Sequence, residues 1–396
     1  MMNLTIIAIT YMLCILLSCS VSASSVPQWM RNAEVYGINY GQWDAESYAK
    51  IASVPFVITN YDEAAIAKLH EMGLRVICYV TFYQMPPDLE YQNANIAAHP
   101  DWVMISEDGK QLLSLFSKPE GEPDNNPGWK AVCRNSSDYR KYAIAYTNYL
   151  MKRGADGIFI DNVVNDTRVC CGPEFRKHEH LFPDKDHVQV NTEFFNALRN
   201  EIKKYGDDKV LILNTDTRRT EWIDVSDGQM LESYICSWAT DKRQDVATIL
   251  DNKKACNPIT DKGCSILSLS YVGYTEHPKR DDVFYCYAWA KISGFLWTDW
   301  FTGGKSASAL LKLRLGQPLG PAEDKDAYII RKFKNGLAVV SREKQGATLK
   351  LSTADYSNVY DVYTVKRLTP DASGDYTITL EPGQGRVFTY ILNKKS

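Results

Sequence analysis

The sequence predicts an α/β protein, with a (β/α)8 TIM barrel at residues 30–317 and a small antiparallel β-sandwich domain at residues 325–396. Two observations support this prediction. Eight short apolar segments occur in the first region, most of them followed by a helical pattern, as in a parallel sheet. After residue 324 the pattern changes to short strands separated by turns. The 396 residues suffice for one barrel and a small domain.

The eight segments are short and are bounded by turn or helix signals, which favours strands. A helix is expected from Asp62 and Glu63 to about Met72, where Gly73 stops it. Another is expected to begin near Ser136, because apolar residues then recur at helical spacing. The predicted strands are 35–40, 55–59, 75–80, 158–160, 209–214, 228–232, 265–270 and 294–299.

A long irregular insert, residues 83–135, follows the third predicted strand, and its Asp108-Gly109 pair predicts a hairpin. Residues 318–324 are expected to link the two domains. Turn residues such as Lys334-Asn335-Gly336 then separate the sandwich strands. These strands are predicted at 328–333, 337–340, 348–351, 376–380 and 386–390.

The N-terminus is typical of an exported protein. Leu4 to Leu17 is an uncharged apolar run that is too short for a membrane span, and Val21-Ser22-Ala23 fits a cleavage site. Residues 1–23 are therefore expected to be a signal peptide, and the protein to be secreted or extracytoplasmic. The alternative is a lipoprotein signal, with a lipid anchor at Cys19.

Removal of the signal peptide leaves eight cysteines, an even number that permits disulfide bonds in an exported chain. Cys256 and Cys264 flank a short loop and are the favoured pair. The adjacent Cys170 and Cys171 are expected to pair with distant partners. Cys78 and Cys286 lie in apolar segments that suit buried thiols.

The composition bears on the kinds of ligand that the protein could bind. A formal net charge of −3 gives no indication of nucleic-acid binding. The 24 Tyr and 9 Trp are compatible with a carbohydrate cleft and equally with a Tyr-rich core. A Gly-rich phosphate loop and a Gly-x-Ser-x-Gly nucleophile motif are both missing from the sequence, and no cofactor is expected.

Two carboxylates stand at predicted strand ends. Asp161 follows Ile158-Phe159-Ile160 on the fourth strand, and Glu232 ends the sixth. The carboxyl ends of barrel strands carry the chemistry, so both side chains are expected at one cleft. Hydrolysis of a glycosidic bond needs such a pair. The alternatives are a turn-capping role for Asp161 and an ion pair for Glu232.

The surroundings suggest a division of roles between the two carboxylates. Tyr234 and Trp238 follow Glu232 and would keep it protonated by burial, as a general acid requires. Asn162, Asn214 or Arg134 would keep Asp161 ionised, as a nucleophile or base requires.

The string from Gly154 to Asn162, GADGIFIDN, resembles the fourth-strand motif of glycoside hydrolase family 114, the endo-α-1,4-polygalactosaminidases. It resembles even more closely the motif of related hypothetical families of barrel glycoside hydrolases. The resemblance spans about Val35 to Asp299 and implies that Asp161 and Glu232 are the catalytic pair. The insert at 83–135 and the Cys170-Cys171 segment depart from the polygalactosaminidases, which leaves the substrate open.

Other residues at the predicted strand ends would line the same cleft and bind a carbohydrate substrate. Their polar and aromatic side chains suit sugar hydroxyls and ring faces. Asp299 is also the chief rival for either catalytic role, whereas Asp156 precedes its strand and is expected to be structural. The expected binding residues are Asn39, Tyr40, Tyr61, Asp62, Tyr79, Tyr83, Asn162, Asn214, Asp216, Tyr271, Trp297 and Asp299.

Three histidines, His178, His180 and His187, follow the fourth strand near Cys170 and Cys171. Their spacing matches no zinc signature, so a solvated loop without metal is expected. Two rivals to a glycoside hydrolase remain. They are a carbohydrate-binding barrel without catalysis and a metal-dependent hydrolase that uses these histidines.

Overall fold

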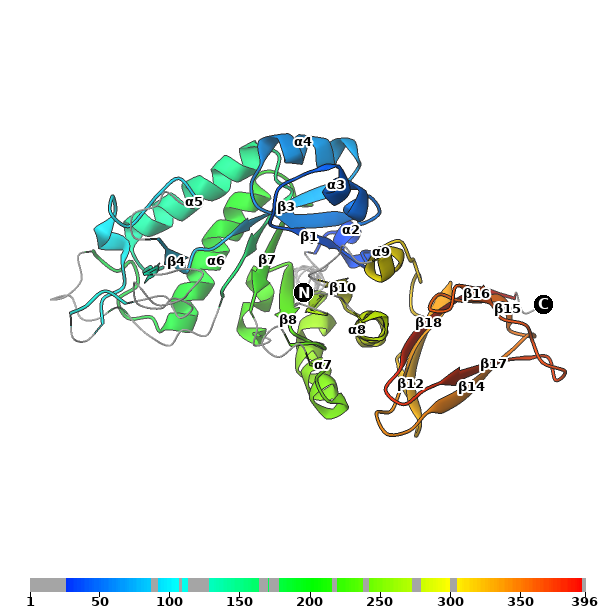
Figure 1. Ribbon diagram of the computed structural model, residues 1–396. Helices are drawn as coiled ribbons and strands as arrows, with labels where there is room; N and C mark the ends of the chain where they lie inside the picture. The colour runs from blue at the N-terminus through cyan, green and yellow to red at the C-terminus, as the bar shows by residue number, and fades with distance from the viewer. Residues whose placement is uncertain are drawn as a thin grey trace, which may run out of the picture.

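The fold is that of a computed structural model of the chain (Figure 1). The predicted signal peptide lies outside the described residues. No helix in the described part of the chain is long and apolar enough to span a membrane. The structure describes residues 26–86, 92–106, 109–112, 128–163, 170, 178–215, 219–237, 242–272, 279–299 and 305–393.

Eight parallel strands form one sheet in the order β1-β2-β3-β6-β7-β8-β9-β10. The amide of Tyr36 donates to the carbonyl of Trp297 at 3.2 Å, and the amide of Trp297 donates to the carbonyl of Glu34 at 3.2 Å. These bonds join the first and last strands, so the sheet is consistent with a (β/α)8 barrel. The strands are β1 (Gly37–Asn39), β2 (Phe56–Thr59), β3 (Arg75–Val80), β6 (Gly157–Ile160), β7 (Val210–Asn214), β8 (Gly228–Glu232), β9 (Ser265–Ser270) and β10 (Leu296–Asp299).

Helices surround this sheet (Figure 1). Five of them begin at an aspartate or serine whose side chain accepts a backbone hydrogen bond, namely Asp44, Asp62, Ser136, Asp186 and Asp245. The helices are α2 (Gln28–Arg31), α3 (Ala45–Ile51), α4 (Glu63–Glu71), α5 (Ser137–Lys152), α6 (His187–Lys203), α7 (Val246–Asp261), α8 (Arg280–Ser293) and α9 (Lys305–Leu311), with short 3-10 turns at Pro100–Trp102 and Thr220–Val225.

Alternate residues of each barrel strand face the interior. The interior cluster contains Ile77, Phe159, Ile212 and Met230, among others, with Tyr40 and Tyr79 at its margin. The residues between them face the helices and belong to a second, larger cluster. The direction of any strand-end side chain therefore follows from its place in this alternation.

The insert after β3 forms a small structure of its own. Strands β4 (Gln84–Met85) and β5 (Lys130–Ala131) pair antiparallel. The predicted hairpin contains residues 107 and 108, which lie outside the described residues. Its flanks pair as expected, because Ile105 bridges Gln111 antiparallel.

The C-terminal part is entirely antiparallel. One sheet has the order β11-β12-β13-β18-β15-β16, and a second contains β14 and β17. Side chains of both sheets form one apolar cluster that includes Val339, Leu349 and Ile378. The strands are β11 (Glu323–Asp324), β12 (Tyr328–Phe333), β13 (Gly336–Ser341), β14 (Ala347–Ser352), β15 (Tyr356–Asp361), β16 (Lys366–Arg367), β17 (Asp375–Leu380) and β18 (Gly385–Leu392).

Helix α8 lies between the barrel and the larger C-terminal sheet (Figure 1). Ala338, Val340 and Val387 of this sheet belong to the same apolar cluster as the buried face of α8. A Cβ atom added to Gly385 would lie 2.4 Å from the Cα of Tyr285. Only glycine therefore permits β18 to approach the helix backbone this closely.

Each predicted strand overlaps an observed one, but β15 was not predicted. Its sequence, YSNVYD, contains Ser, Asn and Asp, which favour turns. Asn358 has a φ of 53°, and the pairing with β18 shifts register between Ser357 and Tyr360. Residues 323 and 324 of the predicted linker form β11 and pair with β12.

The predicted Cys256–Cys264 disulfide is wrong. Both thiols are buried and free, like the other five cysteines among the described residues. Cys256 belongs to α7, whereas the sulfur of Cys264 lies 4.0 Å from the hydroxyl of Ser226. Cys78 and Cys286 are buried thiols, as expected.

Candidate active site

Asp161 directly follows β6, and neighbouring strands hold it in place. Its amide donates to the carbonyl of Val80 at 2.8 Å. Its carboxylate accepts from the Tyr79 hydroxyl at 2.6 Å and from Asn214 Nδ2 at 2.7 Å. Each carboxylate oxygen thus accepts a hydrogen bond, and the two bonds fix the orientation of the group.

Glu232 is the last residue of β8 and is half-buried. Its Oε1 accepts from the Tyr271 hydroxyl at 3.2 Å, and Tyr271 itself is buried in the barrel interior. The residue two positions earlier, Met230, also faces the interior, so Glu232 continues that alternation.

Tyr40 and Tyr271 lie near both carboxylates, and Tyr36 lies near Glu232. Burial raises the pKa of Tyr40 well above its usual value, and the charges of Asp161 and then Glu232 raise it further. Burial and the charge of Glu232 raise the pKa of Tyr36 and of Tyr271, with Asp161 also acting on Tyr271. Because both charges act on Tyr40 and Tyr271, the two carboxylates share one end of the barrel.

Strands β6 and β8 have the same local design. Each begins at the glycine of an Asp-Gly pair, Asp156-Gly157 or Asp227-Gly228, and a carboxylate stands four residues after that glycine. The starting aspartates accept backbone amide bonds at 2.9 Å from Val76 and Leu211, which lie on the preceding strand of the sheet. At its amino end, each strand is therefore attached to its neighbour by a buried aspartate. At its carboxyl end stands a candidate catalytic carboxylate.

The backbone turns sharply after both carboxylates. Asn162 has a φ of 58° and Ser233 a φ of 55°, the left-handed region that most side chains avoid. Asn tolerates this conformation well, but Ser does so less readily. Such local strain concentrates at functional sites, and here it follows both candidate catalytic residues.

Asp156 is structural, as expected. It lies at the opposite end of the strand from Asp161 and accepts hydrogen bonds from Lys209 at 2.8 Å and Val76 at 2.9 Å, with His70 Nε2 also at 2.9 Å. Burial acts to raise the pKa of Asp156, but these bonds lower it overall.

Trp297 and Asp299 do not reach the interior. Leu296 faces the interior, so the alternation directs both residues toward the helices. Trp297 is buried against Tyr287 of α8, with ring centroids 5.2 Å apart. Asp299 is fully buried, accepts from the amide of Val272 at 3.2 Å, and its charge acts on Cys286 of α8. This position removes Asp299 as a rival to Asp161.

Two further candidates, Tyr61 and Asp62, make contacts on the helical side of the strands. The ring of Tyr61 packs on Tyr149 of α5, and its hydroxyl donates to Glu63 at 3.1 Å. Asp62 caps α4 by accepting from the amide of Ala65 at 3.0 Å.

Tyr83 is buried in the larger cluster, with the Arg134 guanidinium 4.1 Å from its ring centre. Arg134 also donates to Asn191 at 3.0 Å and to the carbonyl of Val132 at 2.9 Å, so it is engaged away from Asp161. Asn39 shapes the turn after β1, because its side chain accepts from the amide of Gly41 at 3.0 Å. Asp216 lies outside the described residues.

The site therefore consists of Asp161 and Glu232 with Tyr40, Tyr79, Asn214 and Tyr271, and with Asn162 beside them. Sequence reasoning missed Tyr36, whose hydroxyl is buried without a hydrogen-bond partner in the described part of the chain. The alternation Tyr36, Ile38, Tyr40 along one strand was the signal that could have identified it.

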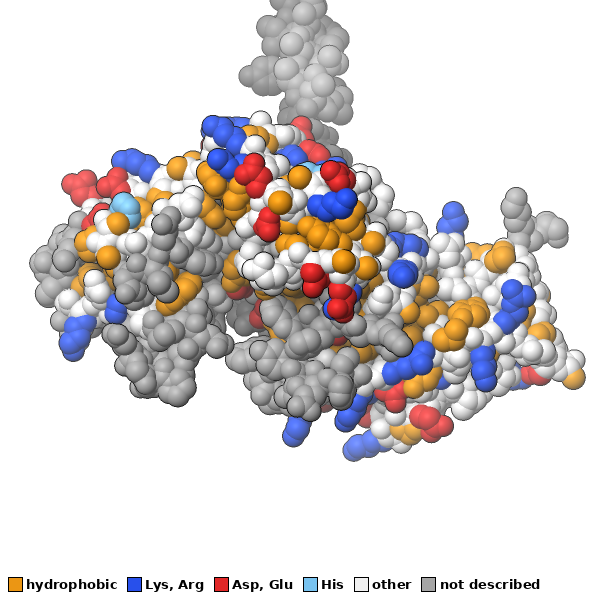
Figure 2. Space-filling view, turned by 45° about the horizontal axis from the view of Figure 1, so that its top comes forward, with side chains coloured by type: hydrophobic (Ala, Val, Ile, Leu, Met, Phe, Trp, Pro, Cys, Tyr) orange, Lys and Arg blue, Asp and Glu red, His pale blue; other side chains and the backbone are white. Residues whose placement is uncertain are grey.

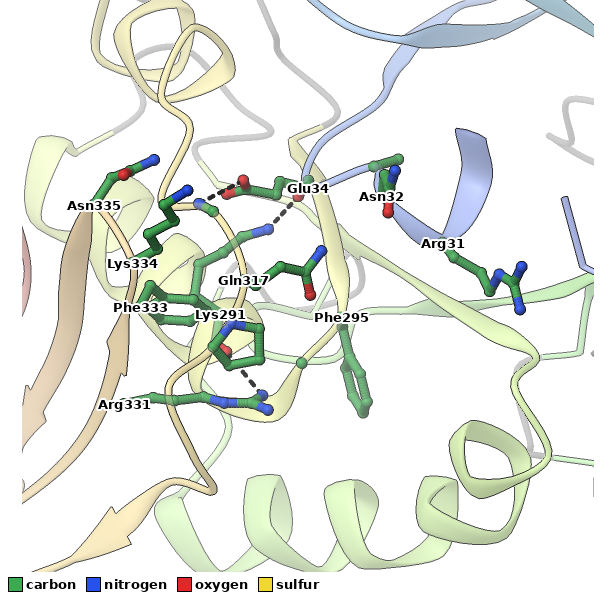
Figure 3. A pocket seen from close by; sticks show the side chains of 14 residues that line it. Arg31, Asn32, Glu34, Lys291, Phe295, Gln317, Arg331, Phe333, Lys334 and Asn335 are labelled. Carbon is green, nitrogen blue, oxygen red and sulfur yellow. Dashed lines mark hydrogen bonds between the residues drawn. The ribbon is translucent and has the colours of Figure 1, made fainter. Parts of the chain in front are cut away.

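A cavity of 510 Å³ lies elsewhere, between the amino ends of β1 and β10 and the C-terminal sheet. Figure 3 shows Lys291 directed at the backbone of Glu34, whose carboxylate accepts from Leu315 and Gly316. Burial lowers the pKa of Lys291 to about 8. The cavity is at the end of the barrel opposite to Asp161 and lies at the joint between the two parts of the protein.

Comparison with protein families gives one match. Residues 79–337 fit the model of hypothetical glycosyl hydrolase family 15. The chain belongs to this family. It is therefore assigned to the glycoside hydrolases, as the carboxylate pair predicts. The comparisons do not show the expected relation to glycoside hydrolase family 114, and no curated protein matches the chain.

Solved structures of glycoside hydrolases have a similar fold. An α-amylase from Geobacillus thermoleovorans, complexed with acarbose, is 11% identical with a TM-score of 0.56, and the match covers 93% of this chain and all of that one. A cyclic α-maltosyl-(1→6)-maltose hydrolase from Arthrobacter globiformis is 12% identical with a TM-score of 0.56, and the match covers 92% of this chain and 99% of that one. At these sequence identities the comparison shows that the folds are similar and shows nothing about activity or substrate.

Proposed function

We propose that this member of hypothetical glycosyl hydrolase family 15 hydrolyses O-glycosidic bonds of a polysaccharide or glycoconjugate, with Asp161 and Glu232 as its catalytic pair. The observation that carries the proposal is the shared position of the two carboxylates. Asp161 directly follows β6 and Glu232 ends β8 of one parallel sheet, and the charges of both act on Tyr40 and Tyr271. A pair of carboxyl groups across the scissile bond is what glycoside hydrolysis requires.

The hydrogen bonds favour different roles for the two groups. Tyr79 and Asn214 donate to both oxygens of Asp161, which suits an anion that attacks the anomeric carbon or takes a proton from water. Glu232 accepts a hydrogen bond from Tyr271 and lies among buried tyrosines, surroundings that favour a neutral carboxyl group. Glu232 would then donate its proton to the glycosidic oxygen as the C–O bond breaks.

The substrate class is a carbohydrate bound at the carboxyl ends of the strands. Tyr40 and Tyr79 are half-buried there, with ring centroids 4.7 Å apart, and offer aromatic surface beside the carboxylates. Structural relatives include enzymes named for α-glucans, so α-glucans belong among the first substrates to test.

The remaining proposals concern location and the second domain. We expect residues 1–23 to direct secretion, with the mature protein outside the cytoplasm. The shared apolar cluster of the two C-terminal sheets supports a β-sandwich. On the face drawn in Figure 2, acidic and basic side chains are interspersed, in keeping with a partner that is not a polyanion.

A screen for reducing-end release tests the proposal. Wild-type protein and Asp161→Asn are incubated with diverse polysaccharides, including galactosaminoglycans and α-glucans. Asp224→Asn is the control, because Asp224 is exposed. Release by wild type and by the control alone would support the proposal. Sugar binding without release by any protein would favour a binding barrel, and equal release by Asp161→Asn would refute the role of Asp161.

A further inference from the structure

Two cysteines and two histidines meet beside the insert. Cys133 lies at the end of the insert, Cys170 between β6 and α6, and His178 and His180 shortly before α6. One ligand atom from each lies within 4.8 Å of all the others. The sulfur of Cys133 is 3.4 Å from His180 Nε2, and that of Cys170 is 3.9 Å from His178 Nε2.

These distances fit a tetrahedral metal site. Zinc binds sulfur at about 2.3 Å and imidazole nitrogen at about 2.0–2.1 Å, so the sulfur–nitrogen edge of its tetrahedron is about 3.6 Å. The two observed distances lie on either side of this value. Two thiolates with two imidazoles also form a donor set typical of structural zinc sites.

Hydrogen bonds hold three of the four residues, Cys133, His178 and His180. His178 Nδ1 is bonded to the carbonyl of Asp101, which leaves Nε2 to face the group, as in metal-binding histidines. The amide of Cys133 donates to the carbonyl of Trp102 at 2.8 Å. His180 bridges Ser136 antiparallel. The Cys133 and His178–His180 segments are therefore already held beside each other, as a shared metal requires.

The group is also shielded from solvent. Cys133 and Cys170 are buried, and they share an apolar cluster with Met104, Ile105 and Ala131. Both histidines are half-buried. The expectation of a solvated loop is therefore wrong for His178 and His180, while His187 begins α6 outside the group.

We propose that Cys133, Cys170, His178 and His180 bind one structural Zn²⁺ ion. Four protein ligands complete a tetrahedron and leave no position for a substrate, so the site is structural. The ion would join the insert to the segment that precedes α6. The sequence did not reveal the site because Cys133 belongs to a different segment from the other three ligands.

Metal content is the first test. The protein is produced with Zn²⁺ in the medium and measured by inductively coupled plasma mass spectrometry. Wild type should hold about one zinc per chain, while Cys170→Ser and His180→Gln should lose most of it. The matched control His187→Gln should keep it. A wild type without zinc, or variants that retain it fully, would overturn the proposal.

A second test needs no variant. Co²⁺ replaces Zn²⁺ in the purified wild type, and the absorption spectrum is recorded. Thiolate-to-cobalt charge transfer and the intense visible bands of tetrahedral Co²⁺ are expected. Mass spectrometry of peptides digested under non-reducing conditions then distinguishes the rival arrangement. A Cys133–Cys170 disulfide, which lowers the mass by two hydrogens, would refute the site.

Discussion

The Tyr79 hydroxyl and Asn214 Nδ2 hold the Asp161 carboxylate from two neighbouring strands. A hydrogen bond to a charged group contributes about 1.5–3 kcal/mol. These donors therefore fix the direction of the Asp161 carboxylate. Their positions on β3 and β7 make the site rigid before substrate binds.

Tyr79→Phe removes one of these donors and keeps the ring. We expect kcat/KM to fall about ten- to hundredfold, because the lost bond stabilises the reacting carboxylate. Steady-state kinetics on the identified substrate measures the change. Tyr61→Phe is the matched control, since the hydroxyl of Tyr61 bonds Glu63 on the helical side. A Tyr79→Phe enzyme within twofold of wild type would contradict this role.

The strand-end candidates show what a single sequence reveals about side-chain direction. Asp161 and Glu232 could be predicted because each follows a recognisable strand. Trp297 and Asp299 could not be excluded as cleft residues. A strand buried on both faces is apolar throughout, so its sequence does not show which residues face the barrel interior. The metal-binding group was missed for a different reason, since the fold alone brings Cys133 to the histidines.

Strand β6 depends on a close approach at its first residue. A Cβ atom on Gly157 would lie 2.4 Å from the carbonyl oxygen of Val210, a backbone atom of β7 that cannot move independently. The Asp-Gly pair thus fixes the amino end of β6, and with it the position of Asp161 four residues later.

Gly157→Ala is expected to destabilise the protein by about 1–3 kcal/mol or more, through overpacking against β7. Chemical denaturation measures the free energy of unfolding. Gly320→Ala is the control, because no atom lies within 4 Å of a Cβ there. Equal stability of the two variants would show that β6 and β7 are not packed this closely.

Buried tyrosines make the free energy of unfolding depend on pH in the alkaline range. Burial raises the pKa values of Tyr36, Tyr40, Tyr271 and Tyr287 above 10 in the folded state. The unfolded chain loses these protons near pH 10, whereas the folded chain keeps them. The folded state then binds more protons, so the free energy of unfolding falls as pH rises above about 10.

Tyr287→Phe tests this dependence. The Tyr287 hydroxyl is buried and has no hydrogen-bond partner among the described residues, so its removal should not lower stability at pH 8. Above pH 10.5, the slope of unfolding free energy against pH should become shallower by about 1.4 kcal/mol per unit. Lys291 acts in the opposite sense, but only between about pH 8 and 10.5. An unchanged slope in urea denaturation series would contradict the prediction.

The central claim is that Asp161 and Glu232 divide the chemistry between them. The most direct test measures Asp161→Asn and Glu232→Gln on the identified polysaccharide and on a 4-nitrophenyl glycoside of the same sugar. The nitrophenolate leaves without protonation, so it does not need a general acid. We expect both variants to lose polysaccharide hydrolysis, and only Glu232→Gln to retain hydrolysis of the nitrophenyl glycoside. Polysaccharide hydrolysis near the wild-type rate by either correctly folded variant would contradict the account.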